Sequence, residues 1–385
     1  MQEPRRGKKI CPECGSPQKY QGLRTRNIHT GRPGILEIKR AYYTCQNKEC
    51  SHTQMPLDTM LGISRHTAAG KFEEQICHLA AVQPFELVQK YLANFDQIEI
   101  TETMIRETTE NCGSTFIKTD EALQDRKDVI IPTRSKILYV QADGSMVPIR
   151  AKERGKPVEY RENKLGIVFR EEDIERKPDD KCVILKKRFA SSLGAGVEHF
   201  EQMLKVTAQR CGSAYAQKIV FISDGAEWLD KMRKRLFPKS THILDWYHAE
   251  EHLWTCARKL FGEQNQEKMH AWVNPLKELL WNGMGEAVCE RLLFEIQRHP
   301  NQQTPIRELY NYLKPRIPKM RYAEFRRKGY FIGSGAIESA NKYLVQARLK
   351  QAGMKWTMHG ASAVIKLREK LYEGTWDSVW GQKAA

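Results

Sequence analysis

Long apolar runs are absent from this 385-residue sequence. No stretch approaches the roughly 20 consecutive apolar residues that a membrane-spanning helix needs. The segment from Met1 to Lys9 also lacks the apolar h-region of a secretory signal. We therefore expect a cytoplasmic protein.

Acidic residues are also comparatively few. The chain has 47 Asp and Glu against 63 Lys and Arg, which gives a formal net charge of +16. An excess of this size is unusual for an enzyme of small neutral substrates, but it suits a polyanion that releases counterions on binding. Nucleic acid is therefore the first partner to consider. With 41% hydrophobic residues, the chain is expected to bury a substantial core in two or three domains.

Four of the ten cysteines form two close pairs, Cys11-Pro-Glu-Cys14 and Cys45-Gln-Asn-Lys-Glu-Cys50. This spacing predicts two knuckles that fold around one tetrahedral Zn²⁺. Four unligated cysteines are the alternative, and His52 could replace Cys50 as the fourth ligand. The remaining cysteines occur singly, which in a cytoplasmic protein indicates core residues or inert thiols; they are Cys77, Cys112, Cys182, Cys211, Cys256 and Cys289.

The segment between the cysteine pairs favours β-structure. Residues Ile35 to Thr44 are rich in β-branched and aromatic side chains, and they follow the turn signal Gly31-Arg-Pro-Gly34. Together with the paired cysteines, this pattern predicts a zinc ribbon over residues 1–60.

Residues 61–117 have helical periodicity. Apolar positions recur at helical spacing from Thr67 to Leu92, and Glu102 to Gly113 resumes the period with glycine as a helix stop. Two helices joined by a break are typical of a helix-turn-helix DNA-binding unit, with Arg106 on the reading helix. On spacing alone, an ordinary helical hairpin fits better. A polar, proline-bearing linker is expected at 118–135.

Strands that lead to acidic residues follow the linker. An apolar run ends in Asp143-Gly144, a second ends in Asp224-Gly225, and a third leads to Asp245. With the helices between them, the predicted order is three strands, a helix, a strand, a helix and a strand. This is the element order of an RNase H-like fold, so we predict an α/β domain with a mixed sheet and flanking helices at 136–249.

A further acidic residue, Glu338, lies in the first turn of a helix predicted to begin within Gly333-Ser-Gly-Ala. Carboxylates at strand ends and a helix start suit hard cations such as Mg²⁺. Each residue also has a simpler explanation: Asp143-Gly144 as a hairpin turn, Asp224 as a helix N-cap, and Glu338 as an acid favoured by the helix dipole. Together with the positive charge and the zinc ribbon, they indicate metal-assisted phosphoryl transfer.

Blocks of the sequence resemble bacterial insertion-sequence transposases of the ISKra type, which belong to the DDE transposases. The resemblance covers most of the chain from Lys136 to Arg368 and implies an RNase H-like catalytic domain, with Asp143, Asp224 and Glu338 as the catalytic triad. The protein would then be bacterial, and associated with the nucleoid when bound to DNA. The blocks are Gln141–Arg150, Phe221–Trp228, Ile243–Trp254, Arg321–Phe325, Ile332–Ser339 and Gly353–Trp356.

Asp245 and His248 form an Asp-x-x-His signature that resembles the one in Mutator-like transposases. A carboxylate at a strand end and an imidazole one turn into the next helix could orient the scissile phosphate or support a metal ligand. Packing and hydrogen bonding of His248 explain the pattern equally well. We therefore predict that both residues support the site without binding the metal.

Residues 250–330 have a helical pattern broken by prolines, which predicts an all-α insertion, as the resemblance also suggests. Its tryptophans fit a core better than a DNA wedge. Residues 331–385 would complete the catalytic core, with Asn341 and Lys342 on the same helix face as Glu338. Four later residues would form either a DNA-facing rim or a solvated basic surface: Arg348, Lys350, Lys355 and Trp356.

These features lead to a two-metal hypothesis. Two Mg²⁺ or Mn²⁺ ions held by Asp143, Asp224 and Glu338 would lower the pKa of a water that cleaves the transposon end, and would then activate the freed 3′-OH to attack target DNA. The partners would be terminal inverted repeats and target DNA. The resemblance implies a homodimer or a larger oligomer. A captured transposase that binds DNA without catalysis and an RNase H-like nuclease that cuts without joining remain as alternatives.

Overall fold

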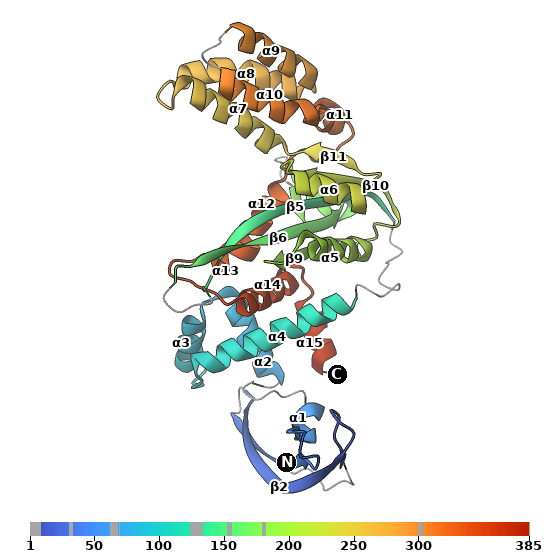
Figure 1. Ribbon diagram of the computed structural model, residues 1–385, viewed down its shortest axis with the longest axis vertical. Coiled ribbons are helices and arrows are strands. Elements are labelled where there is room, and N and C mark those ends of the chain that lie inside the picture. Colours follow the sequence, from blue (N-terminus) through green and yellow to red (C-terminus); the bar gives the residue numbers. More distant parts are fainter. Residues whose placement is uncertain are drawn as a thin grey trace. The chain divides into compact units, whose positions relative to one another are not determined.

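In the computed structural model, the chain folds into two compact units (Figure 1). The first comprises Met1–Thr119 and Thr357–Ala385, and the second comprises Asp120–Trp356. The structure describes residues 9–30, 34–61, 68, 70–123, 134–151, 156–178, 182–298 and 303–384. No helix within these ranges is long and apolar enough to cross a membrane.

An antiparallel sheet forms the first part of unit one. Its strands, in spatial order, are β1 (Lys9–Ile10), β2 (Pro17–His29), β3 (Ile35–Cys45) and β4 (Thr53–Gln54). The short helix α1 (Pro56–Met60) packs on β3, and Ile28, Ile38 and Leu57 form the buried core. The predicted strand at 35–44 is confirmed, whereas residues 31–33 of the predicted turn lie outside the described residues.

Helices form the remainder of unit one. They are α2 (Gly70–Val82), α3 (Phe85–Phe95), α4 (Glu102–Ala122), α14 (Met358–Tyr372) and α15 (Trp376–Ala384). The predicted helical segment from Thr67 to Leu92 is divided at Pro84, because proline lacks the backbone donor that would continue a helix. Helices α2, α3 and α4 share an apolar core that includes Phe72, Ile76, Leu92 and Ile105. Helices α14 and α15 pack against α2 and α4 in a second core.

Helix α4 continues through Gly113, where the sequence predicted that it would end. A Cβ atom at Gly113 would overlap the backbone of Ala363 in α14, so this glycine permits close packing of two helices. The linker expected at 118–135 consequently begins later than predicted. Helix α4 extends to Ala122, and residues 124–133 lie outside the described residues.

A five-stranded mixed sheet forms the centre of unit two, which confirms the predicted mixed α/β class. Its strands are β5 (Ser135–Ile149), β6 (Glu159–Arg170), β9 (Arg188–Leu193), β10 (Ala216–Ser223) and β11 (Thr241–Leu244). The spatial order is β11-β10-β5-β6-β9. Strands β5, β10 and β11 are parallel, whereas β6 pairs antiparallel with both β5 and β9. A two-stranded ladder of β7 (Ile174–Arg176) and β8 (Cys182–Ile184) lies between β6 and β9 in the sequence.

Helices cover both faces of this sheet (Figure 1). Because side chains alternate along a strand, Leu138, Val140 and Ala142 of β5 face one side. There they join the buried core with α5 (Val197–Arg210) and α6 (Glu227–Leu236). Tyr139, Gln141 and Asp143 face the opposite side, where a continuous helical stretch lies: α12 (Gly335–Ala340), the π-helical η5 (Asn341–Gln346) and α13 (Ala347–Leu349).

The segment between β11 and α12 consists of helices joined by short turns in the residues that the structure describes. It contains α7 (Trp246–Phe261), α8 (Gln266–Trp281), α9 (Gly285–Arg298), α10 (Gln303–Leu313), the 3-10 helix η4 (Lys314–Lys319) and α11 (Tyr322–Arg327). Its apolar positions are buried, among them Leu253, Leu276, Leu280, Leu292 and Leu309.

Two features of unit two differ from the sequence-based expectation. Strand β5 does not end at Asp143-Gly144, because Asp143 pairs with Leu165 of β6 and the pairing continues to Ile149. The Asp-Gly pair is therefore not a hairpin turn. In addition, Thr357–Ala385 belongs to unit one, whereas all of 331–385 was predicted to belong to the catalytic core.

Candidate active site at the carboxyl edge of the sheet

Three aspartates belong to neighbouring parallel strands or directly follow them. Asp143 lies in β5, whereas Asp224 and Asp245 directly follow β10 and β11. The last residues that these strands pair are Gln141 with Ile222 and Ser223 with Leu244. Parallel pairing therefore brings acidic residues that are far apart in the sequence to one part of the sheet.

Asp143 is joined to the helical stretch that begins with α12. Nδ2 of Asn341 donates to Oδ2 of Asp143 at 2.7 Å, and the backbone N–H of Gly144 donates to Oδ1 at 2.7 Å. Two residues earlier, Oε1 of Gln141 accepts from the N–H of Ile337 at 3.0 Å. Strand β5 thus holds the helix of Glu338 at two points.

Glu338 lies in the first turn of α12, as predicted, and its side chain is exposed. Oγ of Ser334 donates to Oε1 of Glu338 at 2.9 Å, and the N–H of Ser334 donates to Oδ1 of Asp245 at 2.8 Å. The other oxygen of Asp245 accepts from the N–H of His248 at 3.1 Å and caps α7. Capping therefore accounts for the aspartate of the Asp-x-x-His pattern, because a cap side chain reaches the third helical N–H. Asp245 in turn supports Glu338 through Ser334.

Asp224 directly follows β10 in a tight turn. Its Oδ1 accepts from the N–H of Ala226 at 2.9 Å, and its carbonyl accepts from the hydroxyl of Tyr312 at 2.9 Å. Gly225 has φ +86°, a conformation that favours glycine, and its carbonyl accepts from the Arg316 guanidinium at 2.8 Å. The N-cap position of α6 is Ala226, so Asp224 does not cap that helix. Helix α10 and η4 thus hold the turn that carries Asp224.

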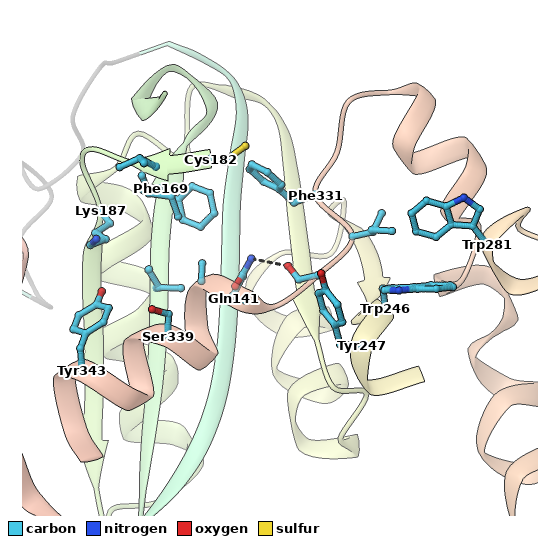
Figure 2. A pocket seen from close by; sticks show the side chains of 17 residues that line it. Gln141, Phe169, Cys182, Lys187, Trp246, Tyr247, Trp281, Phe331, Ser339 and Tyr343 are labelled. Carbon is cyan, nitrogen blue, oxygen red and sulfur yellow. Dashed lines mark hydrogen bonds between the residues drawn. The ribbon is translucent and has the colours of Figure 1, made fainter. Parts of the chain in front are cut away.

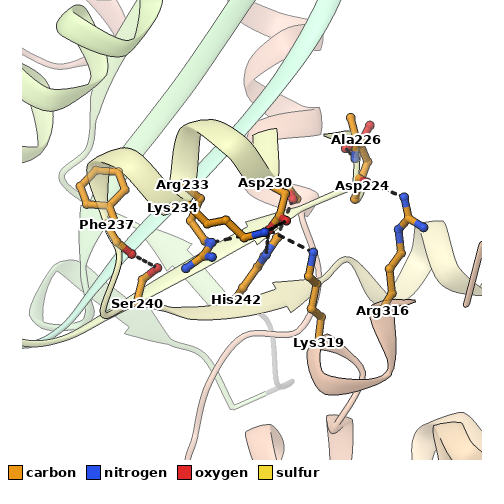
Figure 3. A network of polar contacts seen from close by, with 12 residues as sticks. Asp224, Ala226, Asp230, Arg233, Lys234, Phe237, Ser240, His242, Arg316 and Lys319 are labelled. Carbon is orange, nitrogen blue, oxygen red and sulfur yellow. Dashed lines mark hydrogen bonds and ion pairs between the residues drawn. The ribbon is translucent and has the colours of Figure 1, made fainter. Parts of the chain in front are cut away.

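A buried polar network lies behind this turn (Figure 3). Nδ1 of His242 lies 3.1 Å from Oδ1 of Asp230, and its Nε2 lies 3.0 Å from the hydroxyl of Ser223. Nζ of Lys319 lies 3.1 Å from Oδ1 of Asp230. Burial lowers the pKa of His242 to about 3, so the ring is neutral at pH 7. Ser223, His242 and Asp230 join β10, β11 and α6, and Lys319 adds η4. Because Ser223 is buried, its hydroxyl is not an accessible nucleophile.

The clustered carboxylates repel one another. Burial raises the pKa of Asp143 above its ordinary value of 3.8, and the charges of Asp224 and Glu338 raise it further. The pKa of Asp245 is also raised by burial and, to a smaller extent, by Glu338. These residues therefore share one electrostatic environment, in which a bound cation would relieve the repulsion.

Asn341 is placed to support such a cation. Its side chain is buried, and its Oδ1 accepts no hydrogen bond from the residues that the structure describes. An unsatisfied buried oxygen beside a carboxylate suits the hydration shell of a hard cation. The π-helical segment starts at this residue, and such segments frequently occur at functional sites.

The predicted basic rim is only partly exposed. Arg348 is buried, with its guanidinium 4.8 Å from the ring centre of Trp356, and Nε1 of Trp356 donates to the carbonyl of Leu349 at 3.1 Å. This pair packs inside unit two and does not present a DNA-facing surface, because the guanidinium covers the ring. The other predicted DNA contacts and the helix-face lysine are exposed: Arg106, Lys342, Lys350 and Lys355.

The four paired cysteines of unit one converge. The Sγ atom of Cys11 lies 3.8 Å from that of Cys50, and the Sγ atom of Cys14 lies 3.4 Å from that of Cys45. Four sulfurs at about 2.3 Å from one tetrahedral ion would be separated by roughly 3.8 Å, so the cluster could hold one zinc ion. Cys50 occupies the fourth position, whereas Nδ1 of His52 lies 3.6 Å from Glu13.

Within the described residues, these cysteines alone form a group of at least three potential ligands whose atoms lie within 4.8 Å of one another. The carboxylates of Asp143, Asp224 and Glu338 are spread more widely.

Several residues that build the site were not predicted from the sequence. Gln141 carried a signal, because it is the polar residue inside an otherwise apolar strand segment. Ser334, Tyr312 and Arg316 carried none, since their partners lie on elements far away in the sequence.

Comparison with known proteins gives a family but no established activity. The profile of UPF0236, an uncharacterised protein family, matches residues 13–383. No curated protein matches the chain. Among solved structures, the chain is similar to the Drosophila P element transposase strand transfer complex, at 9% sequence identity over 86% of this chain and 84% of that chain. The TM-score of 0.28 is too low to establish a shared fold.

Proposed function

We propose that this chain, which belongs to the uncharacterised protein family UPF0236, is a DDE transposase that cuts DNA at transposon ends and joins them to target DNA. The observation that supports the proposal is the position of Asp224 directly after β10, the parallel neighbour of the strand that holds Asp143, at the edge where Asn341 attaches the helix of Glu338. The proposed catalytic triad is Asp143, Asp224 and Glu338.

The sheet supports an RNase H-like catalytic domain. In the order β11-β10-β5-β6-β9, each of the neighbours β5, β6 and β9 is antiparallel to the next. Strands β10 and β11 lie on the other side of β5 and are parallel to it. Sheets of this kind place functional side chains at the carboxyl ends of the parallel strands. The helices α7 to α11 would form the all-α insertion between the second and third acidic residues.

The residues at this edge fit divalent cations. The donor set is three carboxylates and the buried amide oxygen of Asn341, which suits Mg²⁺ or Mn²⁺. Two such ions would supply the positive charge that stabilises both the attacking and the leaving oxygen of a phosphodiester. The Cys11, Cys14, Cys45 and Cys50 cluster would hold a structural Zn²⁺.

The protein's own contribution is positioning. Asn341 orients Asp143, Ser334 orients Glu338, and Tyr312 and Arg316 hold the turn of Asp224. Asp245 connects the strand edge to the helix of Glu338 through Ser334. Groups that are fixed before the substrate arrives need little rearrangement during reaction, which lowers the barrier.

The test uses duplex DNA that carries the ends of the encoding element, incubated with Mg²⁺. We expect nicks at the end and covalent joining of pre-cleaved ends to a supercoiled plasmid. Asp143→Asn, Asp224→Asn and Glu338→Gln should each abolish both products while end binding persists. Glu227→Gln removes an exposed carboxylate close to Asp224 and should retain activity, which makes it the matched control.

Other results of this experiment would contradict the proposal or indicate a different function. Strand transfer by all three triad variants would overturn the catalytic assignment. Cleavage without joining would indicate a nuclease. End binding by the wild type without any cleavage would indicate a DNA-binding protein derived from a transposase.

A further inference from the structure

A pocket of about 790 Å³ lies in unit two, near the carboxyl edge of the sheet where Asp143 lies (Figure 2). Gln141 lines it and lies two residues before Asp143 on the same face of β5. The other walls come from β6, β8, the start of α7, the end of α8 and the stretch from Phe331 to Tyr343. The pocket and the acidic cluster therefore share one strand.

Aromatic rings dominate the lining, which includes Phe169, Trp246, Tyr247, Trp281, Phe331 and Tyr343 (Figure 2). Among the described residues that line the pocket, none is acidic, and Lys187 is the one charged residue. A ligand with flat apolar faces and a negative charge matches this composition.

Two of the rings are unusually accessible. Tyr247 is 62% exposed and Trp281 is 39% exposed, whereas Trp246 between them is buried against Tyr322. The ring of Tyr247 rests on the backbone of Gly333, where a Cβ atom would come within 2.9 Å of it. Trp246 thus has a packing role, and Tyr247 offers aromatic surface that the fold itself does not bury.

Cations accompany the rings. Nζ of Lys187 lies 5.6 Å from the ring centre of Tyr343, and the guanidinium of Arg176 lies 5.4 Å from that of Phe331. Burial lowers the pKa of Lys187, so water shields this charge less than it shields a surface lysine. A phosphate would restore the favourable environment of the ammonium group.

We propose that this pocket binds an unpaired nucleobase of the DNA strand next to the bond that is cut, with Tyr247 stacking on the base and Lys187 facing its phosphate. The proposal rests on the function proposed above. The volume lies in the range of small-ligand sites, roughly 300–1,000 Å³, so the pocket admits nucleotides but no duplex. Aromatic stacking accepts any base, so the site needs no particular sequence.

The probe is a single-stranded pentanucleotide with a central 2-aminopurine, compared with a blunt duplex of the same sequence, in Ca²⁺. We expect the wild type to quench the fluorescence of the single strand. Tyr247→Ala should weaken single-strand binding by about 5- to 150-fold, the range measured for loss of one stacking ring. Tyr247→Phe should retain binding, and Lys187→Gln should reduce it and its salt dependence. Tyr160→Ala removes a ring of similar exposure on β6 and is the matched control.

The outcomes separate this site from the proposed catalysis. Asp143→Asn should quench like the wild type although it cannot cleave. Equal single-strand affinities for Tyr247→Ala and Tyr160→Ala would overturn the pocket, even in a protein that cleaves. Loss of quenching in Tyr247→Ala would support the pocket even if the wild type never cleaves.

A second measurement covers a variant that does not fold. The wild type is photocrosslinked to a pentanucleotide with a central 5-iodouracil, and the adducts are mapped by mass spectrometry. Adducts at Tyr247, Trp281, Phe331 or Tyr343 support the proposal, and adducts confined to other peptides overturn it.

Discussion

Nδ2 of Asn341 donates a hydrogen bond of 2.7 Å to Oδ2 of Asp143, across 198 residues of sequence. The bond joins the π-helical segment after Glu338 to the central strand of the sheet. It therefore positions two members of the proposed triad relative to each other, and it makes Asn341 the most direct test of how the site is organised.

Asn341→Ala should weaken metal use without removing a carboxylate. Loss of a residue that orients a metal ligand typically costs about 10- to 100-fold in metal affinity. A Mg²⁺ titration of DNA cleavage should therefore give a half-maximal concentration higher by that factor, with end binding unchanged. Gln351→Ala alters an exposed residue shortly after α13 that has no assigned role in the site, and it serves as the control. Equal titration curves for the two variants would contradict the positioning role.

The raised pKa of Asp143 predicts a pH-dependent stability in metal-free solution. The pKa of Asp143 is higher in the folded state than in the unfolded chain, where it has its ordinary value of 3.8. The folded state therefore binds this proton more tightly. The free energy of unfolding should therefore fall as the pH rises from about 3.8 through the raised pKa. Asp143→Asn has no such group, so it should become more stable than the wild type towards pH 7.

Urea unfolding between pH 4 and 7 measures this difference, and Mg²⁺ should reduce it by binding only the folded wild type. A constant stability difference between the two proteins over this range would show that Asp143 does not carry the pH dependence.

Removal of zinc should unfold the sheet of β1 to β4. Structural zinc sites contribute about 10–16 kcal/mol of apparent binding energy, which a small sheet built around the Ile28, Ile38 and Leu57 cluster cannot replace. We expect one zinc ion per chain by elemental analysis. We also expect loss of strand signal in circular dichroism after chelation or in Cys45→Ser. Cys182→Ser alters an exposed cysteine of unit two and should keep the metal. A fully folded, zinc-free protein would contradict the assignment.

Gly225→Ala should destabilise the protein more than Gly329→Ala does. Both glycines have positive φ, +86° and +73°, so alanine costs about 1 kcal/mol or more at either position. At Gly225 the added Cβ would also lie 2.7 Å from Leu244 and 2.8 Å from Nε of Arg316, whereas at Gly329 it meets nothing within 4 Å.

Overpacking of this kind adds about 1–3 kcal/mol. Urea unfolding gives the comparison, and equal losses in the two variants would show that the turn adjusts freely. Cleavage should also fall in Gly225→Ala, because the turn carries Asp224.

Local patterns predicted a considerable part of this fold. Paired cysteines, the strand at 35–44 and the first-turn position of Glu338 could be read from the sequence, because spacing and side-chain type act over a few residues. The length of β5 could not, since its pairing with β6 continues past an Asp-Gly pair that is typical of turns. The helix end predicted at Gly113 is wrong for a similar reason, because this glycine permits close contact with Ala363, which is far away in the sequence.

The sequence by itself determined the chemistry that is present: an excess of positive charge, four clustered thiols, and acidic residues after apolar strands. Only the tertiary structure decided which residues meet. Parallel pairing of β10 with β5 brings the turn of Asp224 to the strand of Asp143, helix packing buries Arg348 against Trp356, and hydrogen bonds from Ser334 and Asn341 link the sheet to the helix of Glu338. These relationships depend on pairing and packing between distant segments, and no local pattern of residues encodes them.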